Sequence, residues 1–412
     1  MTVGTSLSPR RWLAAALIAL AACNGPGDLL LGRDTLATGG SGGSGGQAGG
    51  PGASGASGAA GAAGAAGPGG SSGSSGQSGA GGSGAAGAAG SAGSTPGMFR
   101  TGVNLSGAEN ASSNPVADKL NYVYFYPTAK ELDYYQGKGL TTIRLPFHWK
   151  RMQPTLMGDL DATQLGYMDK VVGFATDRAM HVILDVHNKD ALYDGQPIGG
   201  DAVPAQAFAD FWGKMAAHYK GNPLVAFDLL NEPLGISPPQ WLGSANAALA
   251  AIRQAGATNL VLVPGVKGGA GAWFTPVAGS SNAETMLGVV DPGDHFVFEV
   301  HQYLDADASG LDESCVSATI GSERLGPFTA WLEQHGHRAF LGEIGAAYDT
   351  TCLSALDDAL THLDQHRDVW SGWAYWAGGP VFKTYYSSVE PVSDTEDRPP
   401  MAVLVKHAEG TP

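Results

Sequence analysis

The stretch Leu224-Val-Ala-Phe-Asp-Leu-Leu-Asn-Glu-Pro233 is an apolar run that stops on a carboxylate. A strand of this kind presents Glu232 at its C-terminal end, because Pro233 prevents further strand pairing. In a barrel of alternating strands and helices, that end is where the chemistry takes place. The plain alternative is a surface glutamate after an ordinary buried strand, and the rest of the chain decides between the two.

Seven other apolar runs share the strand-like character of this stretch, and longer segments with helical spacing separate them. The segment 205–219, for example, carries Phe208, Phe211, Trp212 and Met215 at helical intervals. The predicted strands are Phe99–Leu105, Thr142–Phe147, His181–His187, Val225–Asn231, Leu260–Pro264, Phe296–Tyr303, Ala339–Glu343 and Gly372–Trp376. The predicted helices are Ala205–Tyr219, Pro239–Ala255, Pro327–His335 and Ser354–His366. Eight such units predict an α/β fold, the (β/α)8 TIM barrel, with a doubly wound open sheet as the alternative.

Six of the predicted strands end in polar or aromatic side chains that a barrel would bring to one rim. These residues are Arg144, His187, Asn231, Glu232, His301, Tyr303, Glu343 and Trp376. Asp185 and Glu299 each lie two residues before a rim histidine, so they share its face one layer deeper in the barrel. We expect these two carboxylates to have structural or supporting roles.

Two carboxylates that face each other across a barrel mouth are what glycosidic cleavage needs. One acid protonates the leaving oxygen, and the other supports an oxocarbenium-like transition state. A cation beside one carboxylate keeps it ionised, and Arg144 is the candidate; burial raises the pKa of the other. Tyr303 can hydrogen-bond the nucleophile, Asn231 can donate to a sugar 2-hydroxyl, and Trp376 offers a flat face for a pyranose ring.

Each rim residue also has a purely structural interpretation, as a salt-bridge partner (Arg144), a core histidine (His187, His301) or barrel core (Trp376).

A metal site is the competing chemistry, because histidines and carboxylates are available. The candidate ligands His187 and His301 lack the His-x-His spacing or the His-Glu-x-x-His helix typical of zinc sites. A serine hydrolase is weaker still, since no Gly-x-Ser-x-Gly elbow lies at a predicted strand-to-helix turn. We therefore predict neither a metal nor a cofactor.

At these residues the chain resembles glycoside hydrolase family 5, in its branch of fungal and bacterial endo-β-1,4-glucanases. The resemblance extends from Gly102 to the segment Arg398-Pro-Pro-Met. The stretches that carry it are Ile143-Arg-Leu-Pro-Phe, Asp185-Val-His-Asn, Ala207-Phe-Ala-Asp-Phe-Trp, Phe227-Asp-Leu-Leu-Asn-Glu-Pro, Glu299-Val-His-Gln-Tyr-Leu-Asp, Leu341-Gly-Glu and Trp373-Ala-Tyr-Trp-Ala-Gly-Gly.

The resemblance implies a retaining endo-β-1,4-glucanase that cleaves cellulose or related β-glucans by double displacement. It implies Glu232 as acid/base and Glu343 as nucleophile, with their carboxyl groups roughly 5–5.5 Å apart. It places around the cleavage subsite Arg144, His187, Asn231, His301, Tyr303 and Trp376. A β-mannanase or mixed-linkage β-glucanase on the same scaffold is the alternative enzyme, and a catalytically silent carbohydrate-binding protein is the alternative from another class.

The segment after Asn188 departs from the family pattern. Related enzymes carry an aromatic residue and an arginine there, whereas this chain has Lys189-Asp190-Ala191-Leu192-Tyr193. This leaves glycone-side binding and the preferred glucan open. Trp149 and Trp273 are candidates for additional stacking platforms.

The chain has three cysteines, and Cys23 near the N-terminus is assigned below to a lipid anchor, which leaves Cys315 and Cys352. In an exported protein they suggest one disulfide, with two free thiols as the alternative. The resemblance implies that Cys315 pairs with Cys352 and holds the loops after strands six and seven near the cleft.

The N-terminal quarter of the chain has a different composition. Arg10-Arg11 precede a short apolar run, and Leu20-Ala-Ala-Cys23 resembles a bacterial lipobox. Residues 1–23 thus predict a lipoprotein-type signal peptide with Cys23 lipidated, and ordinary signal cleavage is the alternative. Residues 24–97 are mostly Gly, Ser and Ala, which cannot bury enough apolar surface to fold, so we expect a disordered linker. About 60 such residues reach on the order of 40 Å.

Residues 98–412 remain for the catalytic domain, a length that suits one large barrel. The formal charge of −15 argues against a nucleic-acid partner, because little here could neutralise phosphates. We expect a monomer exported to the cell surface or outer membrane, or released from it, with a β-glucan as its partner and membrane contact only through the lipid.

Overall fold

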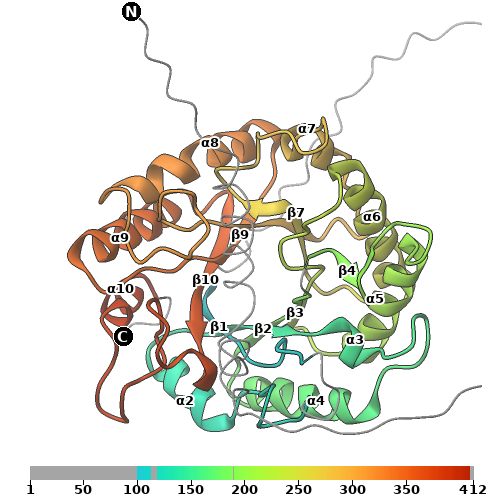
Figure 1. The fold of residues 1–412 in the computed structure, drawn as a ribbon, viewed down its shortest axis with the longest axis horizontal. Coiled ribbons are helices and arrows are strands. Elements are labelled where there is room, and N and C mark those ends of the chain that lie inside the picture. The colour runs from blue at the N-terminus through green and yellow to red at the C-terminus, as the bar shows by residue number, and fades with distance from the viewer. Residues whose placement is uncertain (1–99, 113–117, 189, 409–412) are drawn as a thin grey trace, which may run out of the picture. The chain divides into compact units, whose positions relative to one another are not determined.

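Eight parallel strands close into a barrel in the computed structural model, which describes residues 100–112, 118–188 and 190–408 (Figure 1). Around the barrel the order is β1-β2-β3-β6-β7-β8-β9-β10, and β10 pairs again with β1. This closure confirms the predicted (β/α)8 barrel and excludes the open sheet. The predicted signal peptide, Cys23, the linker and Lys189 lie outside the described residues.

The barrel strands follow the predicted apolar runs closely. Their bounds are β1 (Arg100–Leu105), β2 (Thr142–Phe147), β3 (His181–Val186), β6 (Val225–Asp228), β7 (Val261–Gly269), β8 (Phe296–His301), β9 (Ala339–Glu343) and β10 (Trp370–Gly378). β6 is shorter than predicted, although Asn231 still donates its backbone N–H to Val186 across 2.8 Å. β7 is longer than predicted, and its pairing with β8 is irregular between Pro264 and Gly269.

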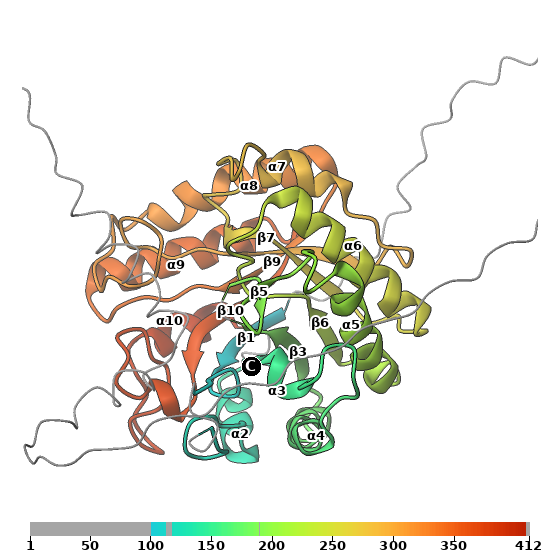
Figure 2. The ribbon, with the colours of Figure 1, turned by 45° about the vertical axis from the view of Figure 1, so that its right-hand side comes forward.

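Helices alternate with the strands on the outside of the barrel, and α5 and α6 lie side by side in both views (Figure 1, Figure 2). The longer helices are α2 (Ala129–Gly137), α4 (Ala162–Thr176), α5 (Ala205–Tyr219), α6 (Pro238–Gln254), α8 (Ile320–His335), α9 (Thr350–Gln365) and α10 (Pro400–His407). The short elements are α3 (Trp149–Met152), α7 (Asn282–Thr285), the 3₁₀ turns η3 (Met286–Gly288) and η4 (Pro380–Phe382), and the hairpin β4 (Leu192–Tyr193) with β5 (Gln196–Pro197). Among the described residues, no helix is long and apolar enough to cross a membrane.

Helix α8 begins earlier than predicted. The prediction started it at Pro327, but the helix runs from Ile320 with Pro327 inside it. A proline inside a helix removes one backbone donor, yet Leu325, Phe328 and Leu332 on the same helix are buried. Burial of this apolar face outweighs the local cost of the proline.

Trp149 and Trp273 are core residues, which corrects the prediction that they serve as stacking platforms. Both side chains are fully buried. The ring of Trp149 packs against Phe208 and Phe211 of α5, and Trp273 packs against Phe298, Phe328 and Trp331. These contacts join the outer helices to the strands and leave no indole face for a sugar.

Helix α10 is held to α9 by His407, and this contact should make stability depend on pH. Burial lowers the pKa of His407, but hydrogen bonds to Asp364 and Asp357 outweigh burial and raise the pKa above its ordinary value of 6.5. The stabilisation is therefore fully present below 6.5 and is lost as the pH rises through the folded-state pKa. His407→Gln should lower the free energy of unfolding by up to about 1 kcal/mol near pH 6, since solvent screens the partly exposed Asp357, and by less near pH 9.

Urea unfolding at the two pH values checks this expectation. Lys406→Gln is the matched control, because it removes another partner of Asp357 and leaves the imidazole in place. Equal destabilisation by His407→Gln at both pH values would contradict the proposed role of the charged imidazole.

Candidate active site

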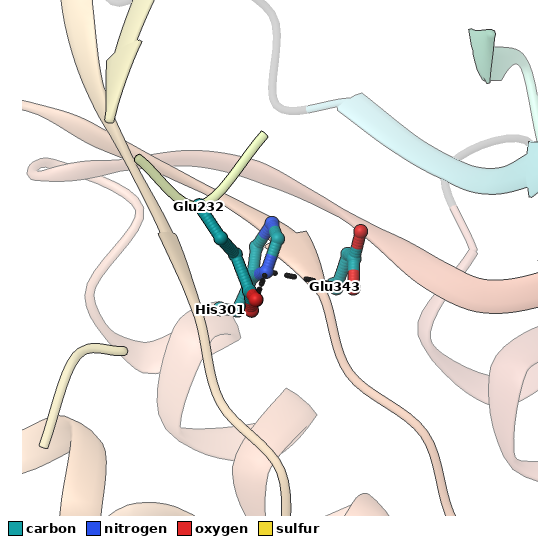
Figure 3. Close-up of side chains that lie close together, drawn as sticks. All are labelled: Glu232, His301 and Glu343. Carbon is teal, nitrogen blue, oxygen red and sulfur yellow. Dashed lines mark hydrogen bonds and ion pairs between the residues drawn. The ribbon is translucent and has the colours of Figure 1, made fainter. Parts of the chain in front are cut away.

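The predicted site residues come together at the carboxyl end of the barrel. Glu343 is the last residue of β9, His301 is the last residue of β8, and Glu232 follows β6. Figure 3 shows these three side chains pointing toward one another from different strands. Their ligand atoms, one from each side chain, lie within 4.8 Å of one another.

Glu343 is the more deeply buried of the two glutamates and accepts two strong hydrogen bonds. Arg144 donates from Nη1 to Oε1 across 2.9 Å, and the Tyr303 hydroxyl donates to Oε2 across 2.7 Å. Burial raises the pKa of Glu343, while the charges of His301 and Arg144 lower it; the net direction is upward. Arg144 therefore lowers the pKa of Glu343, but burial, which was expected to act on the other glutamate, has the larger effect here.

Glu232 is more accessible, and its backbone is strained. Its side chain is 21% exposed, against 5% for Glu343. Its φ of 38° lies in the left-handed region, which costs energy for a residue other than glycine. Gly268 supports this conformation, because a Cβ there would lie 2.8 Å from Cγ of Glu232. The turn after β6 therefore directs this carboxylate toward His301, whose Nδ1 lies 2.8 Å from Oε1 of Glu232.

His301 links the two glutamates. Its Nδ1 lies 3.4 Å from Glu343, and its Nε2 lies 2.7 Å from Glu299. Burial lowers the pKa of His301, but the charges of Glu299 and Glu343 outweigh it and raise the pKa well above 6.5. A protonated imidazole donates from both ring nitrogens, which suits its position between carboxylates. Glu232, His301 and Glu343 therefore form a connected group of titratable side chains that suits proton transfer.

Arg144 is fully buried and connects several side chains of the barrel interior. Besides Glu343, it donates to Asp228 at 2.8 Å, Asn104 at 3.0 Å and Asn231 at 3.1 Å, and it pairs with Asp185 at 3.1 Å. Burial opposes its charge, but Asp185 and Asp228 raise the pKa of Arg144 well above its ordinary value. Its guanidinium therefore stays charged and holds the floor of the site in place.

Sequence reasoning missed two of these partners, Asn104 and Asp228. Asn104 lies in β1 and Asp228 is the last residue of β6, and both side chains are fully buried. A polar side chain in a buried strand needs a partner, so its presence signals a buried network. The sequence thus signals that Asn104 and Asp228 have buried partners, but it does not identify Arg144 as that partner.

His187 and Trp376 form the opposite wall. Nδ1 of His187 lies 2.8 Å from Asp185, and its ring stacks on Trp376 with the centroids 5.4 Å apart and an angle of 17°. Trp376 is 3% exposed and also contacts Phe382 edge-on. The indole is thus largely covered, and its role as a platform for sugar stays a prediction.

Asp185 and Glu299 lie beneath the two histidines, one layer deeper, as predicted. Glu299 is fully buried, and a Cβ at Gly342 would lie 1.7 Å from its Oε1. Position 342 must therefore lack a side chain for this carboxylate to fit beside His301.

Cys315 and Cys352 form a disulfide, which confirms the implied pairing. The bond joins the loop after β8 to the first turn of α9. It thus ties together the two loops that follow the His301 and Glu343 strands.

Comparisons with known proteins agree with this geometry. The family model "Cellulase (glycosyl hydrolase family 5)" matches residues 100–379. Endo-beta-1,4-glucanase B of Aspergillus niger is 36% identical over 295 residues, which cover 71% of this chain and 86% of the relative.

Two solved structures are also similar. The endo-beta-1,4-glucanase Xac0029 from Xanthomonas axonopodis pv. citri has 43% identity and a TM-score of 0.73, and the match covers 76% of this chain and 98% of that one. Pseudomonas stutzeri endoglucanase Cel5A in complex with cellobiose has 35% identity and a TM-score of 0.69, over 76% of this chain and 93% of that one. The chain therefore belongs to the cellulase family, glycosyl hydrolase family 5.

Proposed function

We propose that this protein is a retaining endo-β-1,4-glucanase with Glu343 as nucleophile and Glu232 as acid/base. The observation that carries the proposal is the spacing of the two carboxylates, which have one oxygen each within 4.8 Å. Retaining glycosidases hold their carboxyl groups about 5–5.5 Å apart, whereas inverting enzymes need about 6.5–9.5 Å to admit a water molecule. An oxygen-to-oxygen distance within 4.8 Å is consistent with the retaining arrangement, in which a carboxylate attacks directly.

The two environments support different roles. Glu343 receives hydrogen bonds from Arg144 and Tyr303, which stabilise its ionised form for attack on the anomeric carbon. Glu232 is nearer to solvent and contacts His301. In the first step it gives its proton to the departing sugar oxygen as the Glu343–carbon bond forms. In the second step it removes a proton from water, whose oxygen displaces Glu343 from the same carbon.

The remaining rim residues bind the sugar in this proposal. Arg144 occupies Oδ1 of Asn231, which leaves the amide nitrogen as a donor for a 2-hydroxyl. His187 and Trp376 form one wall of the subsite, and His301 and Tyr303 form the other. The reaction needs no cofactor.

A β-1,4-glucan is the substrate that the relatives support. Each of the similar proteins described above is named as an endo-β-1,4-glucanase or endoglucanase, and one was solved with cellobiose. A β-mannanase or mixed-linkage β-glucanase is the second candidate, because the segment 189–193 departs from the related enzymes on the glycone side.

A hydrolysis profile tests this proposal. Carboxymethyl-cellulose should lose viscosity early and release reducing ends, barley glucan should also be cleaved, and galactomannan should be cleaved far more slowly. In proton NMR of a cellooligosaccharide digest, the β-anomer of the product should appear first, because two displacements retain the configuration. Faster cleavage of galactomannan would favour the mannanase, and an initial α-anomer would exclude the retaining mechanism.

We also propose that the protein is exported as a monomer and anchored through Cys23. The lipobox-like Leu20-Ala-Ala-Cys23 and the Gly/Ser/Ala-rich composition of 24–97 support a lipid anchor followed by a tether. The Cys315–Cys352 bond supports export, because disulfides persist in oxidising compartments. The barrel would then reach polysaccharide outside the cell.

A further inference from the structure

Gly310 lies directly against the ring of Tyr303, the residue that donates to Glu343. A Cβ at Gly310 would lie 2.6–2.8 Å from three carbon atoms of the Tyr303 ring. The φ of Gly310 is 71°, in the left-handed region that favours glycine. Close approach to the ring and backbone conformation thus both require glycine at this position.

Polar contacts hold Gly310 from two sides. Its N–H donates to Oδ1 of Asp305 across 3.0 Å. Its carbonyl oxygen accepts from the hydroxyl groups of both Tyr385 and Tyr386, at 2.8 and 2.5 Å. The two tyrosines belong to the segment after β10, which also places Phe382 beside Tyr303 and Trp376. Two loops from different strands therefore meet at a single peptide unit.

The loop that carries Gly310 is rigid at its base. Asp305 is almost completely buried and also accepts from the backbone of Leu311 and the hydroxyl of Ser309. Arg324 donates to the carbonyl of Tyr303 across 2.7 Å. The Cys315 end of the loop is bonded to α9. Because the loop is held at so many points, Gly310 keeps its position against the Tyr303 ring and limits the movement of that ring.

We propose that Gly310, held by Tyr385 and Tyr386, is a positioning residue that fixes the Tyr303 ring and thereby directs its hydroxyl onto the nucleophile Glu343. This inference rests on the proposed function of Glu343. We call Gly310 and the two tyrosines that hold it, Tyr385 and Tyr386, the clamp. Because Gly310 acts through Tyr303, loss of the clamp should resemble loss of the Tyr303 hydroxyl.

The position of the Tyr303 hydroxyl matters because burial raises the pKa of Glu343. Burial and the charge of Glu343 also raise the pKa of Tyr303 well above 10, so its hydroxyl stays a donor. A hydrogen bond to the ionised carboxylate favours that form. The charged or titratable groups that face Glu343 from the other strands are Arg144, His187, Glu232 and His301. Gly310 contacts the Tyr303 ring itself, so its effect on Glu343 should pass through Tyr303.

The kinetic test combines Gly310→Ala with Tyr303→Phe. Each single variant should lower kcat on carboxymethyl-cellulose by on the order of tenfold or more, with KM nearly unchanged, and should move the acid limb of the pH profile upward. The double variant should be no slower than Tyr303→Phe, because both changes remove the same interaction. Multiplied losses in the double variant, or a Gly310→Ala effect confined to KM, would overturn the proposal.

Two further variants separate positioning from folding. Gly336→Ala is the matched control: Gly336 has a φ of 67° at the end of α8 and nothing within 4 Å of its would-be Cβ, so this variant should show the backbone strain without the kinetic change. Tyr385→Phe/Tyr386→Phe keeps both rings and removes both hydrogen bonds, so it tests the clamp if Gly310→Ala does not fold. This double variant should lower kcat and move the acid limb of the pH profile upward, as Gly310→Ala does.

A measurement independent of turnover distinguishes failure of this inference from failure of the proposed function. Carbon-13 NMR titration of glutamate carboxyls, with Glu343 assigned through the spectrum of Glu343→Gln, reports the pKa of Glu343 directly. Gly310→Ala and Tyr303→Phe should raise it equally, and the double variant should raise it no further. An unchanged pKa in Gly310→Ala would refute the clamp, whereas a wild-type protein inactive on every glucan but with these shifts would refute only the proposed activity.

Discussion

Replacing Glu343 by glutamine is expected to lower kcat on β-1,4-glucans by at least about 10⁴-fold while the protein stays folded. The amide is a far weaker nucleophile than the carboxylate, so the first displacement fails. The fold should survive, because the amide oxygen can still accept from Arg144 and the amide nitrogen can turn toward the oxygen of Tyr303. Initial rates of reducing-end release and a circular dichroism melting curve check both parts.

The matched control is Glu333→Gln, which makes the same chemical change at an exposed position on α8. It should leave the rate unchanged. Near-normal turnover by Glu343→Gln would refute the assignment of the nucleophile.

A rescue experiment makes the role of Glu343 more specific. With Glu343→Gly and azide, an activated aryl β-cellobioside should yield an α-cellobiosyl azide. The azide attacks once, from the side where Glu343 would have stood, so the configuration inverts. A β-configured azide product from this variant would mean that Glu343 is not the nucleophile.

The rim residues could be predicted from the sequence because strand ends in a parallel barrel converge regardless of detail. His301 and Glu343 needed only the strand bounds and the rule that chemistry gathers at the carboxyl ends, whereas Arg144 lies in the middle of β2 and forms the floor of the site. The pairing of Cys315 with Cys352 followed from the family resemblance, and the structure confirms it.

The conformation at Glu232 could not be predicted, because it depends on a neighbour far away in the chain. The strand β6 ends at Asp228, and the backbone then turns through a positive φ at Glu232. Gly268 of β7 provides the space for this turn. Only the closed barrel brings the two segments together.

Residue type also cannot separate a covered indole from an exposed one. Trp149 and Trp273 looked like Trp376 in the sequence, but both are fully buried in the core, whereas Trp376 is 3% exposed and lines the site beside His187. Similarly, the clamp on Tyr303 joins residue 310 to residues 385 and 386, and no local sequence pattern indicates a contact between residues so far apart in the chain.

Replacing Glu232 by alanine should affect substrates according to their leaving groups. Hydrolysis of carboxymethyl-cellulose should slow by about 10²–10⁴-fold, since a sugar alkoxide needs a proton to depart. A 2,4-dinitrophenyl β-cellobioside leaves without help, so its first step should proceed almost normally. The second step should then be slow, because no base activates water, and a burst of dinitrophenol should precede a slow steady state.

Azide should accelerate that slow step, because an anion needs no base. It should give a β-cellobiosyl azide, since Glu343 has already inverted the centre once and azide inverts it again. Glu284→Ala, which removes a carboxylate on α7 away from His301, is the control and should show neither the burst nor the azide product. Opposite azide anomers from the Glu232 and Glu343 variants would distinguish their roles chemically, and an α-azide from Glu232→Ala would show that the two assignments are reversed.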